Sequence, residues 1–263
     1  MAVLKKIRWL SVHIALGAIC VLYFVDRLQQ LGLPTAIYIC LFAAVWTIYL
    51  VDHKLDARKE GLATPRRHFH RASRRLIDGL ILFNLIIGLL AMAFIPRPVV
   101  LGGLFLAGLS LVYLRFAGQL GSWRVKELLT ALCYGAGVML APLYYGPFWP
   151  TLILTSQLAV LALANLLLFS MFEKDADEAE GFSSWVTEMG SRRSEHLLRI
   201  LLALTIVSAI AFMVTLYWRF QLFMLVASLI LFFISFKRDY FGQRERYRVF
   251  GDLVFILPLA LLP

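Results

Sequence analysis

The sequence predicts an all-α, polytopic membrane protein with about nine transmembrane helices. Of its 263 residues, 61% are hydrophobic and only 16% are charged, and the charged residues occur in clusters. Soluble domains contain about 45–50% apolar residues. This composition therefore favours a membrane protein over a soluble protein with a large core.

The nine expected helices correspond to apolar runs that turn-forming residues separate. A run of roughly 17 residues or more can cross the hydrocarbon layer as a helix that rises about 1.5 Å per residue. Gly32 and Pro34 separate the first two runs, and the segment Pro142–Pro150 divides the longest one. The ninth helix is expected to be short or tilted, because Asp252 lies near its start. The predicted helices span residues 8–26, 33–52, 76–95, 98–115, 125–144, 148–172, 198–217, 220–237 and 247–262.

The distribution of Lys and Arg predicts how these helices are oriented. If the N-terminus is cytoplasmic, the N-terminal segment and the loops after helices 2, 4, 6 and 8 hold 23 of the 26 basic residues. The opposite loops hold only Arg27, Arg97 and Arg219. Cytoplasmic loops carry an excess of Lys and Arg. We therefore expect an integral protein of the bacterial inner (cell) membrane, with the N-terminus cytoplasmic and the C-terminus outside. The same bias explains the net charge of +10, so we expect no nucleic-acid partner.

Two pairs of carboxylates follow uncharged apolar runs. Asp52 and Asp56 follow one run, and Glu173 and Asp177 follow a longer one, 128–172. The four-residue spacing within each pair places both side chains on one face of a helix. An even number of membrane crossings separates the pairs, so both should lie at the cytoplasmic face. Converging carboxylates repel one another unless cations lie between them, and Mg²⁺ commonly binds carboxylates together with phosphate oxygens of a substrate. We therefore expect a site for Mg²⁺ and a diphosphate.

The second pair resembles an Asp-rich motif of the UbiA superfamily of intramembrane polyprenyltransferases. That family has nine helices and carries D-x-x-x-D-x-x-x-G after helix 6, with a Ser or Thr soon afterwards. Here Glu173, Asp177 and Gly181 occupy the three motif positions, and Ser183 and Ser184 follow. The leading Asp is replaced by Glu, which is a conservative change.

The first pair resembles the other motif of this family, N-D-x-x-D-x-x-x-D after helix 2, but departs from it. Asp52 and Asp56 match its last two acids, whereas Ile48 and Tyr49 stand at the positions of Asn and Asp. The chain therefore resembles a divergent member, in which Tyr49 either contacts the acceptor or packs against other helices. His53 lies between the two acids in sequence but off their helical face, so it is not expected to bind metal.

The resemblance implies one integral membrane domain, 1–263, with helices around a central cavity that opens to the cytoplasmic side. It implies Mg²⁺-dependent transfer of a polyprenyl group from an isoprenyl diphosphate to an aromatic or otherwise lipophilic acceptor. The prenyl tail would lie among apolar helices that are open to membrane lipid. The implied catalytic residues and metal ligands are Asp52, Asp56, Glu173 and Asp177. The implied diphosphate-binding residues are the basic side chains Arg124, Lys126, Arg66 and Arg67.

Three further polar residues are candidates for the cavity, each with an alternative. Asp175 faces away from the two motif acids on a helix, so it is either an additional ligand or solvated. Asn165 either lines the cavity or ties two helices together, because a buried amide needs a partner. Asp252 either lines the cavity or pairs with Arg246 or Arg248.

Other functions also remain open. A CDP-alcohol phosphotransferase uses paired acids, but its D-x-x-D-G-x-x-A-R signature is only superficially similar to residues 52–58, which lack the Gly and the spacing. A catalytically degenerate UbiA-like protein that binds lipid or assists assembly would explain the lost Asn-Asp. The basic loop 64–75 either caps the site or anchors the chain to anionic lipid headgroups. A transporter is disfavoured, because the mid-membrane segments contain few charged residues.

Overall fold

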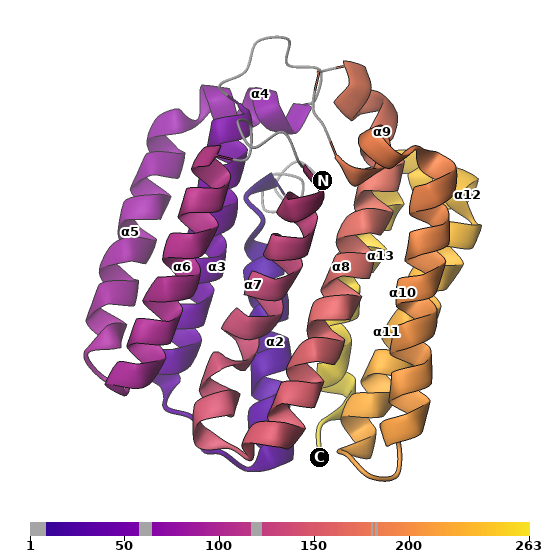
Figure 1. Ribbon diagram of the computed structural model, residues 1–263. Coiled ribbons are helices and arrows are strands. Elements are labelled where there is room, and N and C mark those ends of the chain that lie inside the picture. The colour runs from indigo at the N-terminus through magenta and orange to yellow at the C-terminus, as the bar shows by residue number, and fades with distance from the viewer. Residues whose placement is uncertain (1–8, 58–64, 117–122, 180, 182–183) are drawn as a thin grey trace.

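The protein is a bundle of helices that run roughly parallel to one axis (Figure 1). The computed structural model describes residues 9–57, 65–116, 123–179, 181 and 184–263, and these ranges contain helices but no strand. Seven helices are long and apolar enough to cross a membrane, which confirms the predicted all-helical membrane fold. They are α2 (Val12–Gln29), α3 (Thr35–Asp56), α5 (Arg74–Met92), α7 (Trp123–Tyr145), α8 (Phe148–Ala179), α10 (Ser191–Phe212) and α11 (Trp218–Phe236).

Two further segments lie where the sequence predicts the fourth and ninth helices. The fourth is α6 (Arg97–Phe116), and the last comprises α13 (Arg246–Leu253) followed by the 3₁₀ helix η2 (Val254–Leu261). The expectation of one continuous helix over 247–262 is thus corrected. Pro258 lies inside η2 and has no N–H to donate to the preceding turn, which disfavours a regular α-helix there.

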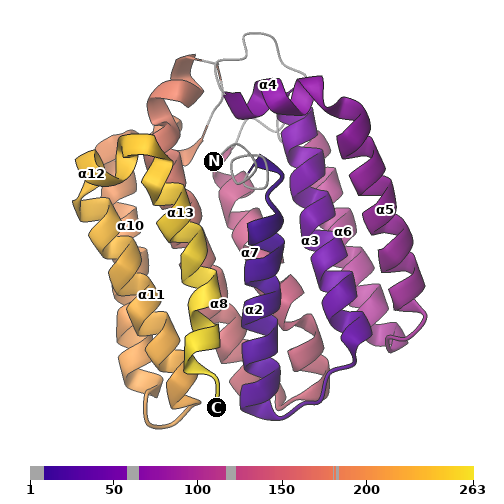
Figure 2. The same ribbon diagram turned by 180° about the vertical axis from the view of Figure 1, so that it is seen from behind.

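The long helices are arranged with α2 and α7 in the middle of the bundle. Helices α3, α5 and α6 lie on one side, and α8, α10, α11 and α13 lie on the other, as both views show (Figures 1 and 2). Four short helices cluster at the upper end, which we call the charged end. They are α4 (Pro65–Ala72), α9 (Trp185–Met189), α12 (Arg238–Gly242) and the 3₁₀ helix η1 (Gln243–Glu245).

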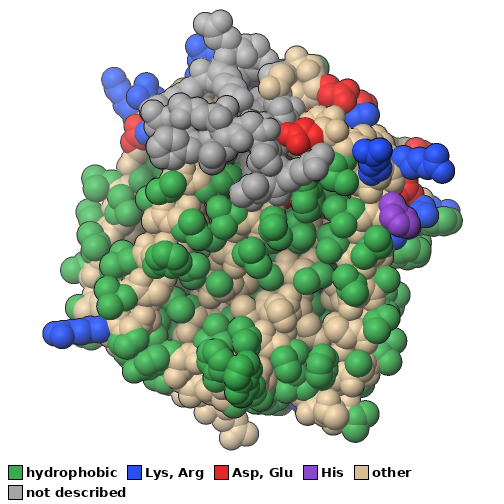
Figure 3. Space-filling model, viewed as in Figure 1, with side chains coloured by type: hydrophobic (Ala, Val, Ile, Leu, Met, Phe, Trp, Pro, Cys, Tyr) green, Lys and Arg blue, Asp and Glu red, His purple; other side chains and the backbone are tan. Residues whose placement is uncertain are grey.

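Charged side chains gather at this charged end, while the side of the bundle is largely hydrophobic (Figure 3). The turns that join α2 to α3, α5 to α6 and α10 to α11 lie at the opposite end (Figure 1). These are the ends that carry Arg27, Arg97 and Arg219, the three basic residues of the predicted outer loops. The chain also ends there, at Pro263 (Figure 1). The described helices therefore alternate in direction as the charge distribution predicts.

The outer surface of α5 is apolar. Leu82, Phe83, Leu89 and Leu90 are all more than half exposed. A soluble monomer rarely exposes a contiguous apolar surface of this kind, whereas a bilayer solvates it. We infer that α5 faces lipid.

Helix α8 is the most buried of the seven candidate spans, with 67% of its apolar window enclosed by other helices. Small residues let α7 approach it closely: a Cβ on Gly135 would lie 2.9 Å from the Cβ of Ala159 and 3.2 Å from its backbone. Packing through small residues is how helices associate where lipid removes the hydrophobic drive between them. Helix α8 contacts other helices on nearly all sides, which explains why its side chains are apolar around the whole helix.

Amide side chains connect α8 to two other helices. Gln157 and Gln221, both buried, exchange hydrogen bonds of 2.9 and 3.2 Å, and Gln157 Nε2 also donates to Ser208 Oγ at 3.1 Å. An amide without a partner in hydrocarbon is costly. These bonds therefore favour one arrangement of α8, α10 and α11 over its alternatives.

Two glycines on α7 test the close approach of α7 and α8. Gly135→Ala should lower the free energy of unfolding by about 1–3 kcal/mol, because the added methyl overpacks the contact with Ala159. Gly137→Ala is the matched control, since its Cβ would meet no atom within 4 Å. Thermal unfolding in detergent should show a lower Tm for the first variant only, and equal Tm values would contradict the close packing.

Candidate functional site

Both predicted acid pairs lie on helices that reach the charged end. Helix α3 continues to Asp56, and α8 continues to Ala179 rather than ending near residue 172. Asp52 and Asp56 therefore lie on one face of a regular helix, and so do Glu173 and Asp177. All four side chains line one cavity of about 410 Å³.

The walls of this cavity come mainly from α3, α6, α7 and α8. Its lining on α3 runs from Ile37 to Asp56, a distance of about 28 Å along a helix. Most of the lining below the acids is apolar, and the ring side chains among it belong to Tyr49, Tyr113, Tyr134 and Phe169. The cavity thus joins an acidic end to an apolar channel within the bundle.

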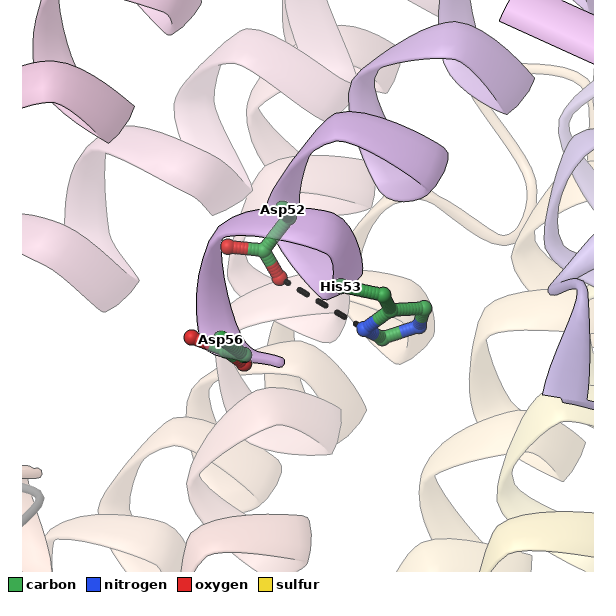
Figure 4. A group of neighbouring side chains, drawn as sticks. All are labelled: Asp52, His53 and Asp56. Carbon is green, nitrogen blue, oxygen red and sulfur yellow. Dashed lines mark ion pairs between the residues drawn. The ribbon is translucent and has the colours of Figure 1, made fainter. Parts of the chain in front are cut away.

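His53 lies beside the first acid pair and lines the same cavity (Figure 4). One ligand atom each from Asp52, His53 and Asp56 can be chosen so that all lie within 4.8 Å of one another. His53 Nδ1 is 3.9 Å from Asp52 Oδ2. The three-residue spacing between His53 and Asp56 is the sequence signal for this proximity, because residues three apart share a helical face.

The ring of His53 is held by the N-terminal segment. Its Nε2 lies 2.9 Å from Ser11 Oγ, and its ring centroid lies 5.2 Å from that of His70. His70 Nε2 in turn donates to the backbone carbonyl of Trp9 at 2.8 Å. Because Nε2 of His53 is directed at Ser11, its Nδ1 is the ring nitrogen that faces Asp52.

The second acid pair meets a basic residue from the last α-helix. Arg248 Nη2 is 2.6 Å from Glu173 Oε1, and Tyr247 Oη donates to the same oxygen at 3.2 Å. Arg248 also lines the cavity, and its side chain is 20% exposed. The sequence suggests Arg248 only as a partner of Asp252, because no local pattern connects residues 173 and 248.

The other three candidates from the sequence lie elsewhere. Asp252 Oδ2 forms a 2.8 Å hydrogen bond with His13 Nε2 of α2, rather than with either of the arginines suggested by the sequence. Asn165 is buried with its Oδ1 directed at Gly251 of α13, where a Cβ would lie only 2.8 Å away. Asp175 is exposed at the charged end. None of these three is among the described residues that line the cavity.

The predicted diphosphate-binding residues lie on helices at the charged end. Two of them are in α4 and two are in the first turn of α7. Their side chains are outside the described part of the structure: Arg66, Arg67, Arg124 and Lys126.

A fifth carboxylate in the cavity, Glu127 of α7, was not predicted. It is 8% exposed, and its Oε1 accepts hydrogen bonds from Ser170 Oγ at 2.7 Å and from the backbone N–H of Trp185 at 3.4 Å. The Trp185 bond fixes the start of α9, where Ser184 and Thr187 form a capping box. The sequence contains one signal for Glu127: this acid directly precedes the uncharged run that starts at residue 128.

The sequence matches no family model and no curated protein. Its fold, however, is similar to that of an apo UbiA homologue from Aeropyrum pernix K1, with a TM-score of 0.69 and 14% identity over 94% of this chain and 96% of that one. It is also similar to a digeranylgeranylglyceryl phosphate synthase, with a TM-score of 0.64 and 12% identity over 98% of each chain. The chain has the UbiA fold. This confirms the fold that the sequence motifs predict.

Glu127 offers a test of how the cavity is covered at its charged end. Glu127→Ala removes the acceptor for the Trp185 N–H, and a hydrogen bond to a charged group is worth about 1.5–3 kcal/mol. Hydrogen exchange at residues 184–189 should therefore become about tenfold faster or more. Asp175→Ala, which removes an exposed acid from the same end, should leave this exchange unchanged. Equal exchange in both variants would contradict the role of Glu127.

Proposed function

We propose that this chain is a UbiA-superfamily enzyme that transfers a polyprenyl group from an isoprenyl diphosphate to an aromatic or otherwise lipophilic acceptor in the membrane. The whole chain would act as one domain, with its charged end facing the cytoplasm. One observation carries the proposal: two acid pairs from α3 and α8 line the same cavity, and that cavity continues as an apolar channel. The UbiA fold supports it.

The donor set of the cavity fits Mg²⁺. Asp52, Asp56, Glu173 and Asp177 supply carboxylate oxygens, which are the ligands that this hard cation prefers. Oxygens of Asp52 and Asp56 lie within 4.8 Å of one another, which is close enough for one cation to contact both. When bound, Mg²⁺ would neutralise the charge that develops on the departing diphosphate.

The remaining residues of the cavity have roles that follow from their chemistry. Its apolar walls would hold the prenyl tail and exclude water from the allylic cation left by loss of diphosphate. Ring side chains such as Tyr49, Tyr134 and Phe169 can stabilise a cation. Basic groups in α4 and at the start of α7 would bind the diphosphate. The acceptor would then form the new carbon bond and release a proton.

A second candidate is a UbiA-like protein that binds isoprenyl lipid without transferring it. Ile48 and Tyr49 in place of the family's Asn-Asp favour this alternative, because the first motif then lacks an amide and a carboxylate. Tyr49 lines the cavity at this position. The CDP-alcohol phosphotransferase reaction gains no support from either structural neighbour.

Ligand binding by the purified protein tests the shared acid site. Asp52→Ala and Asp177→Ala should each weaken Mg²⁺-dependent binding of geranylgeranyl or farnesyl diphosphate by at least about tenfold, because each removes a ligand from one side of the site. Asp175→Ala is the matched control, since Asp175 is exposed and lies two residues from Asp177. It should bind as the wild type does.

Calorimetry in detergent measures these affinities, and wild-type binding by both cavity variants would refute the shared site. Turnover distinguishes the two candidate functions. An enzyme should release diphosphate when incubated with an aromatic or lipophilic acceptor, and Asp52→Ala should abolish this release. Tight, Mg²⁺-dependent binding without release for any acceptor would support the binding protein instead.

A further inference from the structure

The ion pair between Arg248 and Glu173 lies inside the proposed site rather than on the surface. Both side chains line the cavity, and their nitrogen and oxygen atoms are 2.6 Å apart. Glu173 is also one of the four proposed metal ligands. A guanidinium therefore bonds to a carboxylate that the proposed function assigns to Mg²⁺.

The charges of the cavity make this contact significant. Five carboxylates are among the described residues that line it, whereas Arg248 is the one Arg or Lys in that set. An isoprenyl diphosphate would add further negative charge. Bringing that group among carboxylates requires cationic partners, because buried like charges repel strongly and are poorly solvated. Arg248 is the described side chain best placed to be such a partner.

The backbone that carries Arg248 is held firmly against α8. A Cβ on Gly251 would lie 2.5 Å from the ring of Phe169, so α13 and α8 are in close contact there. Tyr247 stacks on Phe172 with ring centroids 4.3 Å apart and planes 3° apart. These contacts fix α13 independently of the ion pair, so the Arg248 side chain can change partner without moving its helix.

The bonding of the guanidinium leaves capacity for a second ligand. Its Nη2 contacts Glu173, and its Nε donates to Tyr247 Oη at 3.3 Å. Arginine has five N–H donors in a planar fork that matches phosphate oxygens. The same group can therefore bind a carboxylate in one state and a phosphate in another.

We propose that Arg248 is a diphosphate-binding residue, which Glu173 holds in the ligand-free protein and releases when Glu173 binds the metal ion. The proposal rests on the proposed function, because it assumes that Glu173 is a metal ligand. It makes Arg248 and Mg²⁺ competitors for one carboxylate. It also makes the metal and the diphosphate cooperative, since metal binding frees the guanidinium for the phosphate.

Competition predicts two changes of opposite sign in the full-length variant Arg248→Gln. Its affinity for Mg²⁺ alone should rise by about threefold to tenfold, because the rival cation for Glu173 is gone. Its affinity for inorganic pyrophosphate at saturating Mg²⁺ should fall by about tenfold or more, because a charge-assisted contact is lost. Calorimetric titration of the protein in lipid nanodiscs measures both quantities.

Arg246→Gln is the matched control. Arg246 lies on the same helix but over the ring of Tyr240, at 4.3 Å from its centroid, and it is not among the described residues of the cavity. Both affinities should stay at the wild-type value in this variant. The same two opposite shifts in Arg246→Gln would attribute the effect in Arg248→Gln to general loss of basic charge and would overturn the proposal.

Two further variants keep the test decisive if Arg248→Gln does not fold. Arg248→Lys keeps the charge but loses the fork, so pyrophosphate affinity should fall by a few fold. Tyr247→Phe removes a donor to Glu173 and the acceptor of Arg248 Nε but keeps the ring stacking. Its Mg²⁺ affinity should rise slightly, and its pyrophosphate affinity at saturating Mg²⁺ should not fall.

The outcomes separate this inference from the proposed function. A parallel fall of both affinities in Arg248→Gln, or no change in either, would show that Arg248 only supports the structure. If Asp52→Ala and Asp177→Ala bind Mg²⁺ and pyrophosphate as tightly as the wild type does, the proposed function is refuted instead. Metal binding that depends on both acids, together with opposite shifts in Arg248→Gln, supports both.

Discussion

The placement of carboxylates in a largely apolar cavity is the constraint on which the rest of the structure depends. A charge that leaves water costs several kcal/mol unless partners compensate it. Two of these acids, Glu173 and Glu127, obtain their partners from distant parts of the chain. Glu173 is bound by Arg248 of α13, and Glu127 accepts hydrogen bonds from α8 and from the start of α9. Tertiary packing of α7, α8, α9 and α13 is therefore also the electrostatic support of the site.

Helix α8 connects this support to the bundle. Its lower part is enclosed by neighbours, through the close contact of Gly135 with Ala159 and the amide pair of Gln157 and Gln221. Its last turns leave the apolar layer as regular helix and carry Glu173 and Asp177 to the charged end. A rigid, buried helix positions these acids more precisely than a loop would. The apolar run and the acidic stretch that follows it are thus two parts of one structural element.

The sequence predicts the parts of this structure that depend on local pattern. Apolar runs identify the helices, because a bilayer requires a minimum length, and basic residues predict their alternation, because Lys and Arg gather on one side. Contacts between distant segments leave no comparable pattern. The partner of Glu173 is 75 positions further along the chain, and the partner of Asp252 is His13, near the other end. The four-residue rule groups acids within a helix, but it cannot say which side chain from another helix will face them.

The departure of the first motif from the UbiA pattern acquires a physical meaning from these contacts. Tyr49 at the position of an Asp removes one negative charge from the cavity, and Arg248 offsets a second at Glu173. His53 also places a ring nitrogen beside Asp52 and Asp56. The cavity therefore carries less net negative charge than it would with an Asp at residue 49 and without Arg248. The substitution at residue 49 and the ion pair of Arg248 with Glu173 therefore act on the same quantity, the net negative charge of the cavity.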